Sequence, residues 1–350
     1  DVDSKRDHPI TFPLGLQGLG LPPGSAIIFD QKTDTESKAV FMDVTWKATD
    51  KARISFGARR TEDNIAIISN DTLSIPAFGL VLPTCTRDTD FDFSSTTIRV
   101  ASQYDLSDSG NVYLSYSEGF KAGGLNSDCS SAYEPEEVDA WELGTKWTLF
   151  SGTTTVNAAF FRYDYKDFQV AQIIGLTNLI TNAQADINGF ELEVWSNLDE
   201  HWSINAGITL LDGEYEDFLN TDALHPEKGL QQLKGNQLNR MPDESINLGI
   251  VYQTTLGSGG SLRLRVDTAY RSRIYFREYN EREDSQRPYT VVNFNAVWES
   301  ADNNWVGRLF ANNLTDEEYK AHLSGEDSTG GRNGTWGMPR QVGVEVTRRF

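Results

Sequence analysis

Apolar and polar residues alternate with a period of two along most of this chain from residue 38 onward. In one stretch Trp141 and Leu143 fall on one face while Glu142 and Gly144 fall on the other, as successive side chains of a β-strand do. No long segment with the 3.6-residue period of a helix competes with this pattern. The alternation predicts thirteen antiparallel strands between residue 38 and the last residue, Phe350.

The connections between the predicted strands alternate between short and long. Short turns are predicted at 49–51, 107–110, 150–152, 198–201, 256–260 and 300–303. Long connections are predicted at roughly 64–93, 121–136, 166–185, 214–242, 276–287 and 313–339. This regularity is typical of outer-membrane β-barrels, which have short periplasmic turns and long extracellular loops. A β-sandwich mixes its connection lengths instead.

The direction of the strands predicts how the chain is divided. Single-chain bacterial barrels have an even number of strands, with both ends on the periplasmic side. Counted back from the end, the strand at 38–48 also runs downward. Residues 1–37 are therefore expected to be an extracellular loop or a truncated start, and residues 38–350 the carboxyl-terminal part of a larger barrel. The segment 25–30, SAIIFD, is expected to be a loop.

Composition narrows the choice of function. The 350 residues carry a formal net charge of -20, from 51 acidic and 31 basic side chains. This charge argues against nucleic acid as a partner, because phosphates require a basic surface. No apolar run approaches the roughly 18 residues of a spanning helix.

Sequence motifs for catalysis are missing. The four histidines are scattered, with no HExxH pattern, and no serine lies in a G-x-S-x-G elbow. We therefore expect no catalytic residue, no metal ligand, no cofactor and no enzyme activity. Cys85 and Cys129 both lie in polar stretches, where a disulfide between them and two free thiols are both open.

Several stretches occur in an order that resembles TonB-dependent receptors of the siderophore-receptor type. They are YSEGFKAGGLN (116–126), YEPEEVDAWELGTKW (133–147), FFRYDYKDFQV (160–170), NAQADINGFELEV (182–194), NNLTDEEY (312–319) and the closing GMPRQVGVEVTRRF (337–350). The resemblance covers about residues 38–350. It implies an all-β, antiparallel transmembrane barrel in which the 13–14 strands of this chain are part of a 22-strand barrel.

The same resemblance implies a function and a location. Receptors of this type lie in the bacterial outer membrane and import a scarce nutrient, most often a ferric siderophore, with energy delivered by the TonB complex. The plug domain, the energy-coupling box and the first strands are absent from this chain, so TonB is expected to act through the missing amino-terminal part. Lipopolysaccharide and the outer-membrane assembly machinery are further expected partners.

The closing strand is expected to act as the assembly signal through Val342, Gly343, Val344, Val346 and Phe350. Its valine face would contact lipid and its polar face the lumen. The family usually has a tyrosine-like residue two positions before the terminal phenylalanine, where this chain has an arginine.

Aromatic residues beside charges in the long connections are candidate ligand contacts. They are Tyr275, Arg277, Tyr279 and Trp336. An ordinary solvated loop surface remains the alternative at these positions. Two other functions also remain open: a secreted β-sandwich binding module, and a self-contained porin-like channel of fourteen strands closed by pairing of the final strand with residues 25–30.

Overall fold

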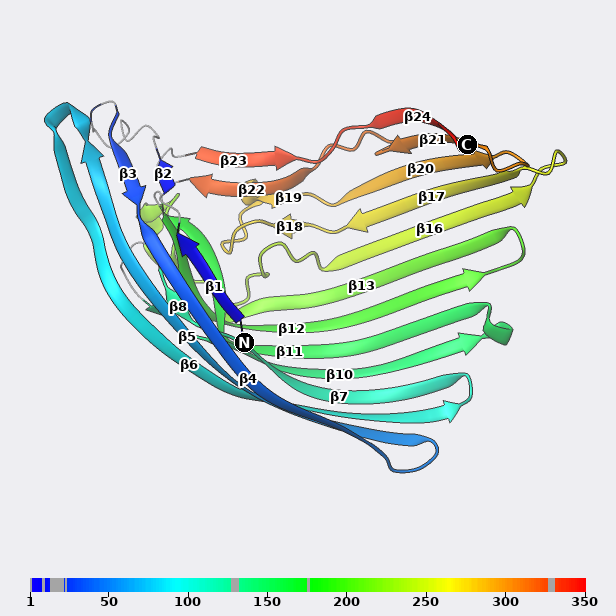
Figure 1. Cartoon of the computed structure of the whole chain (residues 1–350), viewed down its shortest axis with the longest axis horizontal. Helices are drawn as coiled ribbons and strands as arrows, with labels where there is room; N and C mark the ends of the chain where they lie inside the picture. The colour runs from blue at the N-terminus through cyan, green and yellow to red at the C-terminus, as the bar shows by residue number, and fades with distance from the viewer. Residues whose placement is uncertain are drawn as a thin grey trace.

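The computed structural model describes residues 2–7, 10–12, 22, 24–126, 132–174, 177–326 and 331–350. These residues form one large, curved antiparallel sheet, with small two-stranded sheets at one end (Figure 1). Within the described residues, thirteen long strands follow one another in chain order, which confirms the predicted number. They are β4 (Gln31–Lys47), β5 (Ala52–Ile75), β6 (Leu80–Ser107), β7 (Gly110–Lys121), β10 (Glu136–Leu149), β11 (Thr154–Ile174), β12 (Thr177–Asn197), β13 (Trp202–Asp217), β16 (Glu244–Thr255), β17 (Ser261–Arg271), β20 (Tyr289–Glu299), β21 (Trp305–Asn312) and β24 (Gln341–Arg348).

The remaining described elements are short. Three lie beside the first long strands: β1 (Val2–Asp7), β2 (Ile10–Phe12) and β3 (Ala26–Phe29). Four pairs form the small sheets: β8 (Gly124–Leu125) with β9 (Ala132–Tyr133), β14 (Leu219–Thr221) with β15 (Leu230–Gln232), β18 (Ile274–Tyr275) with β19 (Ser285–Gln286), and β22 (Lys320–Glu326) with β23 (Gly331–Trp336). The helical turns are η2 (Pro76–Phe78), η3 (Phe150–Gly152), η4 (Pro226–Lys228) and η5 (Arg282–Asp284). No helix among the described residues is both long and apolar enough to cross a membrane.

All six predicted short turns are confirmed, and they lie together at one end of the sheet with the C-terminus (Figure 1). Local hydrogen bonds explain why they are short. In the turn between β12 and β13, one carboxylate oxygen of Asp199 accepts the backbone N–H groups of His201 and Trp202, each at 2.7 Å. Asn303, between β20 and β21, has a φ of 57°, a conformation that asparagine tolerates better than most residues.

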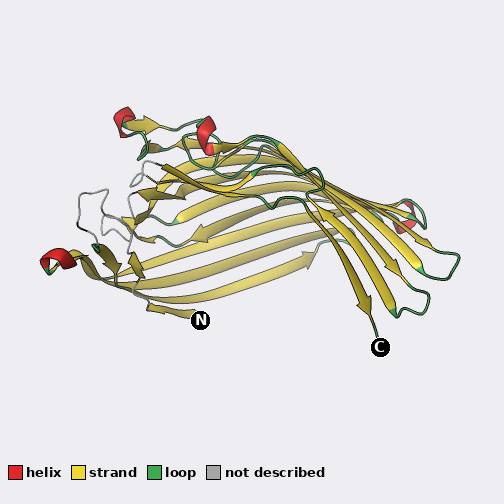
Figure 2. Cartoon of the chain, turned by 90° about the horizontal axis from the view of Figure 1, so that it is seen from above, coloured by secondary structure: helices red, strands yellow, loops and turns green. Residues whose placement is uncertain are grey.

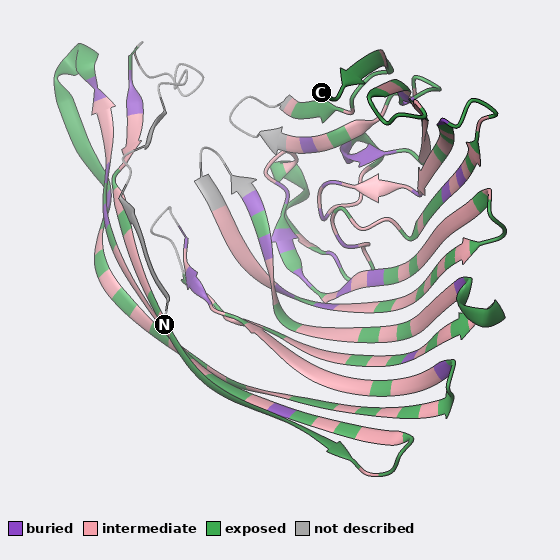
Figure 3. Cartoon of the chain, turned by 45° about the vertical axis from the view of Figure 1, so that its right-hand side comes forward, coloured by how far each residue is buried: buried purple, intermediate pink, exposed green. Residues whose placement is uncertain are grey.

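The two faces of the large sheet differ as the alternation predicts, and we call them the apolar face and the polar face. Trp141 is 49% exposed on the apolar face, and Glu142 follows it on the polar face. The apolar face carries exposed large side chains on most of the long strands: Val44, Phe56, Val100, Leu114, Leu143, Phe160, Leu210, Leu248, Val266, Trp298, Leu309 and Val344. Figure 3 shows the exposed and half-buried positions alternating along the strands. An uncovered apolar surface of this extent fits contact with lipid.

This arrangement excludes one of the alternative architectures. A β-sandwich would bury these side chains between two sheets, whereas the other described sheets are two-stranded and leave the apolar face uncovered. The sandwich hypothesis is therefore wrong. The fourteen-strand channel requires β24 to pair with residues 25–30. Among the described strands β24 pairs with β21, and β3 pairs with β2 and β5, so this hypothesis lacks its closing pair.

Three sequence predictions about irregular segments were wrong. The segment 25–30 contains the strand β3, because Ile27 and Ile28, whose branched side chains favour a strand, pair with the extended part of β5. The predicted long connection 64–93 is mostly hairpin, since β5 and β6 continue in antiparallel register as far as η2. The predicted long connection 166–185 is also mostly hairpin, because β11 and β12 stay paired as far as Ile174 and Thr177. The strand predicted to begin at position 38 also starts seven residues earlier, at Gln31. Whether residues 1–37 are extracellular stays a prediction.

Several glycines of the large sheet lie under aromatic rings of the neighbouring strand. A Cβ atom on Gly144 would lie 2.3 Å from Cζ of Tyr113, which is directly opposite on β7. The same Tyr113 hydroxyl donates a hydrogen bond of 2.6 Å to Glu142. Gly189 is covered in the same way by the ring of Phe161. Glycine therefore lets these rings lie flat against the next strand and pack the polar face.

We expect Gly144→Ala to destabilise the folded sheet by about 1–3 kcal/mol, since the ring of Tyr113 must leave its position. The measurement is the temperature at which the folded form converts to the unfolded form on an SDS gel. Gly207→Ala is the matched control, because nothing lies within 4 Å of a Cβ atom built there. Equal shifts for both variants would contradict the packing role.

The final strand, β24, is the last long strand of the sheet and pairs with β21. Its alternate valines are exposed on the apolar face: Val342, Val344 and Val346. Gly343 lies under the ring of Phe310 on β21. Phe350 is fully exposed, and the guanidinium carbon of Arg348 lies 4.8 Å from its ring centre. The unusual arginine thus contacts the terminal aromatic ring, while the assembly signal itself stays a prediction.

One of the two cysteines can be placed. Cys85 is buried in β6 and is disulfide-bonded. Cys129 lies outside the described residues, so the pairing of the two stays a prediction.

Candidate functional site

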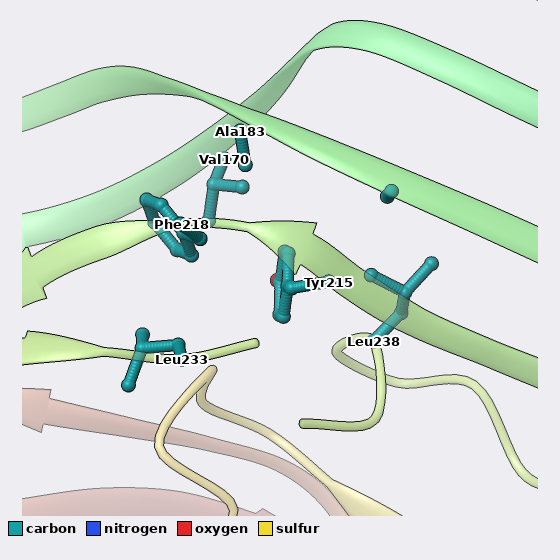
Figure 4. Close-up of a cluster of buried hydrophobic side chains, with 7 residues drawn as sticks. Val170, Ala183, Tyr215, Phe218, Leu233 and Leu238 are labelled. Carbon is teal, nitrogen blue, oxygen red and sulfur yellow. The ribbon is translucent and has the colours of Figure 1, made fainter. Parts of the chain in front are cut away.

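The long connections of the C-terminal half form a packed layer at the end of the sheet opposite the short turns, and we call it the loop layer (residues 218–243, 272–288, 313–326 and 331–340). A buried cluster joins it to the strands: Val170, Ala183, Ala185, Tyr215, Phe218, Leu233 and Leu238 (Figure 4). Ala183 and Ala185 are an even number of residues from Glu191 in β12, so the layer packs on the polar face. The loop layer is therefore anchored to the sheet by apolar contacts.

Arg277 lies at the centre of the loop layer, between two carboxylates. Its Nη2 atom donates to Asp222 and its Nη1 atom to Asp284 at 2.9 Å, and both aspartate side chains are 0% exposed. The ring of Tyr279 lies 4.9 Å from the guanidinium carbon. Burial acts to lower the pKa of Arg277, but the hydrogen bonds to both aspartates outweigh it and the pKa is raised. Arg277 therefore links the connection 218–243, through Asp222, to its own connection, 272–288, through Asp284.

A second arginine extends the same network. Arg332 of β23 donates to Asp284 at 2.5 Å and lies 3.2 Å from Glu283 and 3.7 Å from Glu281. Lys228 pairs with Glu281 from the other side. The carboxylates of this part of the layer are thus neutralised by Arg277, Arg332 and Lys228.

The four predicted ligand contacts have different environments. Arg277 and Tyr279 lie inside the buried network, and Tyr275 is half-buried in β18, which pairs with β19. Trp336, at the end of β23, is 64% exposed. The structure thus brings Arg277 and Tyr279 together and leaves Trp336 with a surface open to a ligand. Ligand binding by any of the four stays a prediction.

Trp336 borders a pocket of about 350 Å³ that we call the basic pocket. Its lining residues are Arg273, Arg282, Ser285, Gln286, Arg287, Glu318, Lys320 and Trp336. Four of these eight side chains are cationic and one is anionic, in a chain whose net charge is -20. Sequence reasoning identified only Trp336 among them. The available signal was the number of arginines between positions 271 and 287.

Another pocket lies on the wall of the sheet. It has a volume of about 460 Å³ and is lined mainly by polar-face residues of β4 to β10, among them Arg53, Arg99, Glu142 and Lys146. Its charges are partly paired, since Arg53 donates to Asp105 at 2.6 Å. We regard it as part of the lumen wall.

Two groups in the described residues have the donor types that a divalent cation uses. One is Asp222, His225 and Glu281, and the other is Asp186, Glu214 and Glu216. In the first group the carboxylates already pair with Arg277 and Lys228. The second group consists of carboxylates alone.

Glu278 is buried beside the network and gives the loop layer a pH dependence. Burial raises its pKa above the ordinary 4.5, although its carboxylate accepts a hydrogen bond of 3.1 Å from Asn220. When the layer is open, Glu278 has its ordinary pKa of 4.5 and loses its proton above that pH, whereas in the closed layer it keeps the proton to a higher pH. Between these two pKa values the closed layer therefore becomes less stable relative to the open one as the pH rises.

We therefore expect Glu278→Gln to stabilise the closed layer at pH 7, with no effect well below pH 4.5. Hydrogen–deuterium exchange of residues 218–241 measures this directly, and Glu227→Gln, at an exposed position of the same layer, is the control. An effect that persists unchanged at low pH would show that ionisation of Glu278 is not its cause.

Comparison with known proteins identifies the architecture. A family model described as "TonB dependent receptor-like, beta-barrel" matches residues 6–314. The protein named "Probable TonB-dependent siderophore receptor PiuA" of Acinetobacter baumannii is 27% identical over 247 residues, covering 65% of this chain and 31% of the relative. The pesticin receptor of Yersinia enterocolitica is 23% identical over 338 residues, covering 91% of this chain and 44% of the relative.

Solved structures share the fold. The ferric yersiniabactin uptake receptor FyuA of Yersinia pestis superposes with a TM-score of 0.76 at 21% identity, covering 93% of this chain and 47% of that one. The siderophore receptor PiuA of A. baumannii gives 0.69 at 19% identity, covering 91% and 43%. The chain therefore spans less than half the length of these relatives.

Proposed function

This chain belongs to the family of TonB-dependent receptor-like β-barrels, and from that premise we propose that it is part of a receptor for the energised import of a ferric siderophore. Proteins of this family are outer-membrane receptors and transporters and do not form an enzyme class. The observation that carries the proposal is the family match over residues 6–314, joined to relatives named as siderophore receptors. The uncovered apolar face and the packed loop layer support it.

In this proposal the parts of the chain have separate tasks. The long strands form a wall of the barrel, with the apolar face against lipid and the polar face toward the lumen. The loop layer contributes contacts to the ligand outside the membrane. With a Kd of about 1 nM and an association rate of about 10⁶ M⁻¹ s⁻¹, dissociation takes place at about 10⁻³ s⁻¹. Release at a useful rate then requires work, which the TonB complex would supply.

Two further partners follow from the same proposal. The assembly machinery of the outer membrane would recognise β24 and its terminal Phe350. Lipopolysaccharide would surround the extracellular end of the strands. Both depend on the barrel lying in the outer membrane.

The test is uptake of iron by the full-length receptor in a bacterium that lacks its other siderophore receptors. We expect radiolabelled iron to accumulate from at least one ferric siderophore only when the receptor is present, and accumulation to stop when TonB is inactivated. Uptake that continues without TonB would favour a passive channel. If binding and uptake are absent for all siderophores while another TonB-dependent nutrient is imported, the siderophore part of the proposal is wrong.

A further inference from the structure

The basic pocket differs from the other charged parts of the loop layer in one respect. Arg277, Arg332 and Lys228 all pair with carboxylates, and these pairs occupy Asp222, Asp284, Glu281 and Glu283. By contrast, no ion pair links Arg273, Arg282 or Lys320 to a carboxylate in the part of the chain that the structure describes. Arg287 lies 3.7 Å from Glu317, and its side chain is 71% exposed. The pocket therefore holds an excess of positive charge.

Neutral groups hold two of these cations, Arg273 and Lys320, in place. Arg273 donates a hydrogen bond of 3.0 Å to the hydroxyl of Ser285, and the ammonium of Lys320 donates at 3.0 Å to the carbonyl of Ser285. Gln286 accepts the backbone N–H of Lys320 at 2.7 Å, which ties β19 to β22. Ser285 and Gln286 are both buried. A cation held by hydroxyl and carbonyl oxygens keeps its full charge. Its side chain has already lost much of its conformational entropy, so binding an anion costs less entropy.

The rim of the pocket adds a second chemical preference. The exposed ring of Trp336 lies beside the cationic lining, and β23, which carries it, pairs with β22 next to β19 (Figure 1). A large exposed indole favours a flat aromatic partner by stacking. Guanidinium groups favour oxyanions, which they bind through two parallel hydrogen bonds. One ligand class combines both features: aromatic rings that carry negatively charged oxygens.

We propose that the basic pocket binds one arm of an anionic ferric chelate whose iron ligands are aryl oxygens, as in a catecholate. This inference rests on the proposed function, because it names the class of siderophore that the receptor takes. The volume of about 350 Å³ suits one aromatic arm and not the whole complex. Ferric tris-catecholate complexes carry three negative charges, whereas ferric trihydroxamate complexes are neutral, so the pocket distinguishes the two by charge.

The test measures binding directly, without import. Outer membranes containing the full-length receptor are incubated with the ⁵⁵Fe complex of a tris-catecholate or of a trihydroxamate, and bound iron is counted after washing. We expect the tris-catecholate complex to bind at least about tenfold more tightly than the neutral complex. Its binding should also weaken as salt is raised, since the cations are partly exposed.

Two sets of variants locate the binding. Arg273→Gln with Arg282→Gln should weaken tris-catecholate binding at least about tenfold, while Arg59→Gln with Arg60→Gln, two exposed arginines of β5, changes the net charge equally and should have no effect. Trp336→Ala should weaken binding and Trp336→Phe should restore most of it. Because Trp336 is mostly exposed, its replacement leaves the fold intact and keeps the test valid if the double variant assembles poorly.

The possible outcomes separate this inference from the proposed function. If the receptor imports a neutral chelate and the pocket variants bind normally, the pocket assignment is wrong while siderophore import stands. If inorganic phosphate competes as well as the tris-catecholate complex, the pocket is a general anion site suited to the phosphates of lipopolysaccharide, and the assignment is also wrong. If the tris-catecholate complex binds and the pocket variants lose it, but TonB-dependent uptake is absent, the pocket assignment holds and the transport proposal fails.

Discussion

Arg277→Met is expected to open the loop layer. The substitution keeps most of the side-chain volume but leaves Asp222 and Asp284, both 0% exposed, without the cation that lies between them. Removing one partner of a buried ion pair costs about 3–5 kcal/mol, because the remaining charge stays buried without compensation. Hydrogen–deuterium exchange should therefore rise in residues 218–241 and 276–287, while strands β16 and β17 remain protected.

The control for this prediction is Arg282→Met in the same connection. Arg282 is exposed, so Arg282→Met should change the free energy of opening, as measured by exchange, by less than about 1 kcal/mol. Acidification offers a second check, since it neutralises unpaired carboxylates and should restore part of the protection in Arg277→Met. Unchanged exchange in Arg277→Met would show that the network does not hold the layer together.

The role of Arg277 also shows which features the sequence predicts and which it does not. Strands and short turns are local: a period of two and a few turn residues determine them, and the six turns and thirteen strands were found in this way. The partners of Arg277 are not local, since Asp222 lies 55 positions earlier and nothing in either neighbourhood marks the pair. The sequence therefore predicts a ligand contact at Arg277, which stays a prediction, but not the two buried carboxylates between which its guanidinium lies.

The basic pocket was missed for the same reason. Its lining comes from two connections, one around Arg273 and Arg282 and the other around Lys320 and Trp336. Only after these connections fold together does it become clear which cations have carboxylate partners. The hairpin of β5 and β6 was missed for a different reason: residues 64–93 are polar enough to be interpreted as a loop, yet their backbone hydrogen bonds continue the sheet. Polar composition separates strands from loops poorly outside the membrane, where both faces of a strand contact water.

We expect the second large effect, a loss of folding stability in the membrane, for Val344→Arg, because the apolar face contacts lipid. Val344 is 74% exposed near the middle of β24, opposite Leu309 of β21. An arginine on the lipid-facing surface of a barrel costs about 2–4 kcal/mol at the midplane of the bilayer. The folded fraction in lipid vesicles should fall accordingly in a urea titration, and less receptor should reach the outer membrane.

Thr347→Arg provides the matched control in the same strand. Thr347 is an odd number of residues from Val344, so it lies on the polar face and an arginine there reaches water in the lumen. The effect of Thr347→Arg on the free energy of unfolding should stay within about 1 kcal/mol. This pair of variants tests the physical basis of the fold itself, because a soluble protein with the same sheet would tolerate an arginine at either exposed position. Equal tolerance of both substitutions in vesicles would mean that the alternating valines of β24 do not contact lipid.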